Sequence, residues 1–134
     1  MAFAAFALCI ALTGAGTGDA PAARLPVEAF SLIWTHSVER IEWREEWRIA
    51  NGLLVLEEAR VRGNGAGMEV PDGAKLVDGS WIYQPHVPPL ERLNLANSSF
   101  TADYRLCAND GCMDLAEVTG AADRPLTLFP CADP

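Results

Sequence analysis

The sequence predicts an all-β fold, an antiparallel β-sandwich or small barrel built on a central Asn-Gly hairpin. Residues Ile41–Ile49 alternate between two sets of side chains, which is the period of a β-strand. Asn51-Gly52 follows directly, and both residue types tolerate the positive φ of a two-residue hairpin turn. Many short β-rich runs separated by turn residues follow, and no helical period persists long enough to predict a helix.

The hairpin has a predicted register. Its second strand is Leu53–Arg62, and a two-residue turn places Trp47 opposite Leu56. Counting residues outward from the same turn predicts two further cross-strand pairs, Glu45 with Glu58 and Trp43 with Arg60. The side chains of Glu42, Arg44, Glu46 and Arg48 then form a solvated row on the other face.

The predicted register gathers Trp43, Glu45, Glu58 and Arg60 into one polar cluster. Opposed carboxylates destabilise a sheet, and charges that face a core are costly unless they are paired. Arg60, a ligand or a cation must therefore neutralise this group. The cluster is the predicted functional surface, and it is either a buried structural network or an open binding site.

The remaining strands are short. The first long strand is predicted at Val27–Val38, and the Pro-rich segment after Tyr83 excludes a central strand there. The Gly-rich loop Gly63–Gly73 lacks the features of a phosphate-binding or dinucleotide-binding loop, so its glycines are interpreted as chain geometry. Further strands are expected at Lys75–Val77, Ser80–Tyr83, Arg92–Ala96, Ala102–Leu106 and Met113–Ala116.

The chain of 134 residues suits one domain with a small core. Residues 1–22 resemble a secretory signal peptide, although no Lys or Arg precedes the apolar run, and residues 23–134 form the predicted β domain. We expect a periplasmic or otherwise exported protein without stable membrane insertion after cleavage. The net charge of −8 argues against a nucleic-acid partner, because phosphate binding needs a basic stripe.

Removal of the leader would leave three cysteines. Cys107 and Cys112 flank a run of turn formers, so a hairpin brings their sulfurs within reach of a disulfide. A two-residue loop sets them directly opposite, whereas a bulge at Gly111 sets them one step out of register. We interpret this bond as a structural staple. Cys131 is left over near the C-terminal end, and its partner stays open between a second chain and another thiol.

Candidate catalytic groups are few. His36 and Ser37 are neighbours and point to opposite faces of a strand, so they cannot form a nucleophile and base pair. His36 with Glu39 and Glu45 could hold a divalent cation, but no short ligand spacing supports a metal site. A Glu45–Glu58 pair could do acid–base chemistry, because opposed carboxylates raise one pKa. No cofactor is expected.

Several motifs together resemble those of one bacterial family. They are Trp34-Thr35-His36-Ser37-Val38-Glu39, the tryptophans Trp43 and Trp47 around Glu45, Glu58-Ala59-Arg60 before Gly65-Ala66-Gly67-Met68-Glu69, and Phe100-Thr101-Ala102-Asp103-Tyr104 before Cys107. Over Phe30–Leu115 the chain resembles domain-of-unknown-function family 1850. That resemblance implies a small exported protein, often encoded beside TRAP-type solute transporters with TAXI-class binding subunits.

Three function classes follow. The first is a periplasmic accessory or binding module that contacts TRAP-type transporter subunits or holds a small solute, with candidate ligand-binding residues His36, Glu39, Trp43, Glu45, Glu58, Arg60 and Glu69. The alternatives are a small metal-dependent or carboxylate-based hydrolase and a purely structural envelope protein. Whether the protein is an enzyme is left open, and no catalytic residue is assigned.

Overall fold

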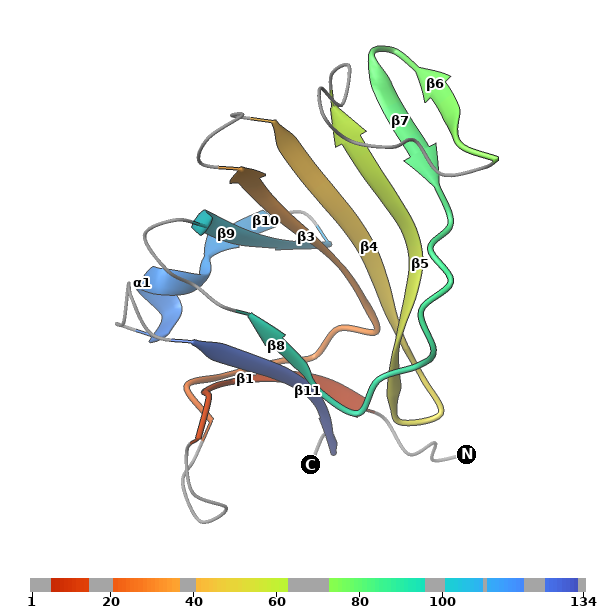
Figure 1. Ribbon diagram of the computed structural model, residues 1–134. Helices are drawn as coiled ribbons and strands as arrows, with labels where there is room; N and C mark the ends of the chain where they lie inside the picture. The colour runs from red at the N-terminus through yellow and green to blue at the C-terminus, as the bar shows by residue number, and fades with distance from the viewer. Residues whose placement is uncertain are drawn as a thin grey trace.

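The chain forms two antiparallel β-sheets that pack together as a sandwich (Figure 1). This computed structural model describes residues 6–14, 21–36, 41–62, 73–95, 101–109, 111–119 and 125–132. The predicted all-β class is confirmed.

The larger sheet contains seven strands in the order β10-β9-β3-β4-β5-β7-β6, and the smaller contains four in the order β2-β1-β11-β8. In the large sheet these are β3 (Ala29–His36), β4 (Glu42–Ala50), β5 (Leu53–Arg62), β6 (Lys75–Val77), β7 (Ser80–Tyr83), β9 (Thr101–Ala108) and β10 (Gly111–Asp114). In the small sheet they are β1 (Phe6–Leu12), β2 (Ala23–Leu25), β8 (Leu93–Leu95) and β11 (Leu126–Ala132). The β6–β7 pair projects past the small sheet (Figure 1).

The core lies between the two sheets. Because side chains alternate along a strand, each sheet sends every second residue inward. The large fully buried aliphatic residues come from both sheets and from one short helix, and they are Leu8, Ile10, Leu32, Leu54, Val61, Leu106, Leu115, Leu126 and Leu128.

The turn between β4 and β5 has the predicted form, but the register changes beyond it. Asn51 and Gly52 have φ of 54° and 75°, and Trp47 pairs with Leu56 as predicted. A β-bulge then shifts the register between Trp47 and Glu46, and Glu57 is the extra residue on β5. The observed pairs beyond it are Glu46–Glu58, Glu45–Ala59, Arg44–Arg60 and Trp43–Val61. The predicted Glu45–Glu58 and Trp43–Arg60 pairs are therefore wrong.

The bulge has a clear cause in the order of apolar residues along β5. Leu54 and Leu56 occupy even positions, whereas Ala59 and Val61 occupy odd ones, and all four are buried. A regular strand would turn one of these pairs to solvent, because its faces alternate strictly. One extra residue keeps both pairs in the core.

A short helix was not expected. The predicted strand at Met113–Ala116 ends at Asp114, and α1 occupies Leu115–Thr119. The Asp114 carboxylate accepts a hydrogen bond from the backbone N–H of Ala116 at 2.9 Å, in the manner of a helix N-cap. Leu115 is fully buried, so tertiary packing holds a helix too short to form alone. Among the described residues, no helix has the length and hydropathy needed to cross a bilayer.

The N-terminal apolar run lies inside the fold. Phe6–Leu12, predicted to belong to a leader, is β1, and Cys9 is bonded to Cys131. The partner of Cys131, which the sequence leaves open, is therefore Cys9 of the same chain. The Cys107–Cys112 disulfide is present as predicted, and the two residues are directly opposite, as in the two-residue loop.

Candidate functional site

The predicted polar cluster is divided between the two faces of the large sheet. Trp43 and Glu45 pair with the buried residues Val61 and Ala59, which places them on the inner face. Glu58 pairs with Glu46 on the outer face, and Arg60 pairs with Arg44 there. The four residues do not form one site, because the bulge at Glu57 reverses the face of every later residue on β5.

Three other predicted ligand-binding side chains cannot be placed. His36 ends β3, but its side chain is outside the described part of the molecule. Glu39 and Glu69 also lie outside the described residues. Their predicted role as ligands stays a prediction.

The inner face carries an aromatic group around Trp43. Its indole stacks on that of Trp34, with ring centroids 6.0 Å apart and planes within 10°. Trp34 also contacts the ring of Tyr104 at 5.6 Å. Trp43 therefore contacts an aromatic ring in place of the predicted Arg60 guanidinium.

Glu45 is a partly buried acid on this same face. Its carboxylate accepts a hydrogen bond from the indole N–H of Trp47 at 3.1 Å. Burial raises the pKa of Glu45, and the Trp47 hydrogen bond offsets part of that rise. The register places Ala59 between Glu45 and Tyr83, and the pKa of Tyr83 is raised by burial and then by the Glu45 charge.

On the outer face, opposed like charges are compensated along each strand. Glu46 faces Glu58 and Arg44 faces Arg60 across the two strands. Arg44 Nε donates to Glu46 Oε1 at 2.6 Å, whereas Arg60 lies 3.5 Å from Glu58 Oε2. The Ser31 hydroxyl donates to Glu46 Oε2 at 2.5 Å and lies 3.2 Å from an Arg44 terminal nitrogen. Arg44 is therefore held firmly, while Arg60 is held only loosely.

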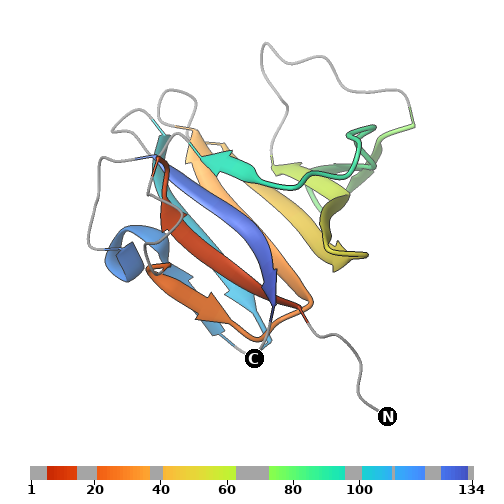
Figure 2. The same ribbon diagram turned by 90° about the horizontal axis from the view of Figure 1, so that it is seen from below.

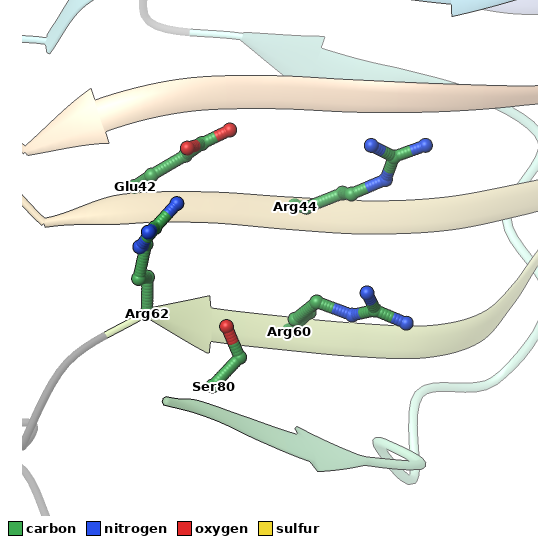
Figure 3. Close-up of a pocket in the computed structure, with 5 residues that line it drawn as sticks. All are labelled: Glu42, Arg44, Arg60, Arg62 and Ser80. Atoms are coloured by element: carbon green, nitrogen blue, oxygen red, sulfur yellow. The ribbon is translucent and has the colours of Figure 1, made fainter. Parts of the chain in front are cut away.

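An open hollow of about 180 Å³ lies on this outer face (Figure 3). It is lined by three arginines, one carboxylate and one hydroxyl, namely Arg44, Arg60, Arg62, Glu42 and Ser80. Figure 3 shows the Arg44 and Arg60 side chains extending in the same direction along their strands, with Glu42 and Arg62 at the other end of the hollow. Three neighbouring strands, β4, β5 and β7, supply these groups. This arginine hollow presents several guanidinium donors to one space.

Sequence reasoning included Arg60 but missed the other four lining residues, Glu42, Arg44, Arg62 and Ser80. Arg44 was assigned to the solvent row, and Arg60 was placed on the wrong face. The useful signal was the change of apolar residues on β5 from even to odd positions after Leu56. That change predicts a bulge, and the bulge brings Arg60 and Arg62 to the face of Arg44.

Of the two kinds of chemistry proposed from sequence, the acid–base pair loses its geometry. Glu45 and Glu58 lie on opposite faces of the sheet, so they cannot share a proton as an acid–base pair. The divalent-cation site at His36, Glu39 and Glu45 stays a prediction, because the His36 side chain and Glu39 lie outside the described residues. Within the residues that the structure describes, no group of three or more His, Cys, Asp or Glu side chains could hold a metal ion.

Comparison with known proteins places the chain in a family. No curated protein and no solved structure matches it. The model of the family described as "Domain of unknown function (DUF1850)" matches residues 30–115, which run from the second residue of β3 through β10 and include the whole arginine hollow. The chain therefore belongs to the DUF1850 family.

Proposed function

We propose that this protein is an exported accessory module that binds a small anionic solute in the arginine hollow. The observation that carries the proposal is the Arg44–Arg60 pair, directly opposed on adjacent strands, with Arg62 beside it. Glu46 compensates Arg44 at 2.6 Å, whereas Glu58 lies 3.5 Å from Arg60 and compensates it only weakly. A bound anion would relieve the remaining repulsion between the two opposed guanidinium groups.

The donor set suits a carboxylate or a phosphate. A guanidinium offers planar paired donors that match two oxygens of either group. Arg44 has its Nε engaged by Glu46, but Arg60 is loosely held and retains free donors. The Ser80 hydroxyl adds a neutral donor at the β7 side of the hollow.

The size of the hollow limits the ligand. Sites for drug-sized molecules commonly enclose about 300 Å³ or more. A hollow of about 180 Å³ therefore suits a solute of a few heavy atoms. Glu42, which also lines the hollow, would repel an anion at that end and restrict it to the Arg44 and Arg60 end.

The proposed setting is a TRAP-type solute transport system, and it rests on the resemblance described above. In this setting the module acts in the periplasm, either by holding the solute or by contacting the transporter subunits. Co-purification with these subunits, and an effect of deleting the gene on solute uptake, are the expected results. If neither result is obtained, the transport part of the proposal is wrong. Anion binding is tested by a separate experiment.

Anion binding is tested by calorimetry with small mono- and dicarboxylates and with inorganic phosphate. We expect binding of at least one anion that weakens tenfold or more in Arg60→Gln and less in Arg62→Gln, because Arg62 lies at the Glu42 end of the hollow. The matched control is Arg48→Gln, because Arg48 lies on the same face of β4 but pairs with Glu57 outside the hollow. No binding by any anion, or an equal loss in the control, would contradict the proposal.

A further inference from the structure

The strand β1 occupies an interior position of the small sheet. Figure 2 shows β1 and β11 side by side, and seven residues of β1 pair with β11. On its other edge, Leu8, Cys9 and Ile10 pair with β2. Without β1, β2 would lose its neighbour in the sheet and β11 would expose a long edge, which favours pairing with other chains.

The side chains of β1 are also integral to the core. Leu8 and Ile10 are fully buried against residues of the opposite sheet, and Ala7 and Cys9 are equally inaccessible. Phe6 lies over the turn that joins β4 and β5, where a Cβ on Gly52 would be 3.2 Å from its ring. The apolar run thus has the pattern of a buried strand, which a hydropathy count cannot distinguish from a leader.

A covalent bond ties β1 to the opposite end of the chain. Cys9 and Cys131 are joined across a sequence separation of 122 residues. Forming the bond removes two protons and two electrons from the two thiols, and a disulfide-bearing thiol oxidant of the export compartment accepts them by exchange. Once it has formed, cleavage of the peptide chain after residue 22 would not release β1.

We infer that Phe6–Leu12 remains in the mature protein as a permanent strand, held by the Cys9–Cys131 disulfide. If an export signal is cleaved from this protein, the cleavage leaves Phe6–Leu12 in the mature chain. The inference reverses the expectation drawn from hydropathy for residues 1–22, and it does not depend on anion binding at the arginine hollow.

The first test is the mass of the protein recovered from the exported fraction of cells that express the full chain. We expect a species that contains residues 6–12, with no thiol labelled before reduction. After tryptic digestion without reductant, the peptide ending at Arg24 should be linked to the peptide that contains Cys131. Two pieces joined by this disulfide would also support the inference, because β1 is still held. A chain that begins at or near Ala23, with Cys131 open to labelling, would overturn it.

The second test compares Cys9→Ser with wild type and requires only that the protein be recovered. If β1 is retained, Cys9→Ser leaves a new labelled thiol at Cys131. Its mass still includes residues 6–12 if the chain is uncleaved, and it loses them if wild type is two pieces joined by the disulfide. If the segment is removed, the variant and wild type give the same mature mass and the same labelling. Cys107→Ser is the matched control, since it should free Cys112 and leave Cys131 protected under the inference. Identical mature products from Cys9→Ser and wild type would overturn the inference.

Discussion

Truncation of two adjacent residues, Val61 and Arg60, tests the bulged register of β5. Val61 is fully buried on the inner face, and Val61→Ala removes two methyl groups from the core. At about 0.8 kcal/mol per buried carbon plus a cavity term, the loss should be about 2 kcal/mol of unfolding free energy. Among the described residues, Arg60 forms an exposed ion pair with Glu58 at 3.5 Å, so Arg60→Ala should cost about 0.5 kcal/mol or less.

Urea unfolding followed by tryptophan fluorescence measures both changes. A register without the bulge reverses the ranking, because Arg60 would then face the core beside Glu45 and Val61 would face solvent. In that arrangement Arg60→Ala would leave buried carboxylates without a cation and should cost about 3 kcal/mol or more. Equal or reversed losses for the two variants would therefore refute the bulged register. Arg48→Ala serves as a second exposed control on the same sheet.

Three further changes have defined outcomes. The pKa of Glu45 is raised in the folded state, so the contribution of Glu45 to stability is greatest below its unfolded-state pKa and is lost as pH rises through the folded value. In thermal melts, Glu45→Gln should remove that fall and be more stable than wild type at neutral pH but not at acid pH. Replacing both Cys107 and Cys112 by Ser should lower stability by about 2 kcal/mol or less, because the closed loop is short; loss of all folded signal in circular dichroism would contradict this. Gly52→Ala should lower the melting temperature, because φ is +75° there and the new methyl would meet Phe6; an unchanged melting temperature would argue against β1 lying over this turn.

The strongest local patterns were sufficient for the centre of the fold. Alternation over Ile41–Ile49 and the Asn51-Gly52 pair predicted β4, its turn and the first part of β5, because these depend on neighbouring residues alone. The Cys107–Cys112 bond was predictable for the same reason, since a tight turn brings its ends together.

The remaining features depended on contacts between distant residues. The two possible registers of β5 differ only in which face packs against the other sheet, and burial of Ala59 and Val61 decides between them. Hydropathy could not distinguish a leader from a core strand at Phe6–Leu12, because both are apolar. The segment is a strand because it pairs with β11, which lies more than a hundred residues later in the chain.

The arginine hollow also depends partly on local sequence and partly on contacts between distant residues. The sequence by itself determined that strands rich in alternating charge would border the turn, because a period of two separates polar from apolar side chains. Tertiary structure alone decided that Arg44, Arg60 and Arg62 meet on one face with Ser80. The physical reason is that burial of Ala59 and Val61 in the core requires the bulge in β5. The bulge then determines which charged side chains lie together on the solvent-exposed face.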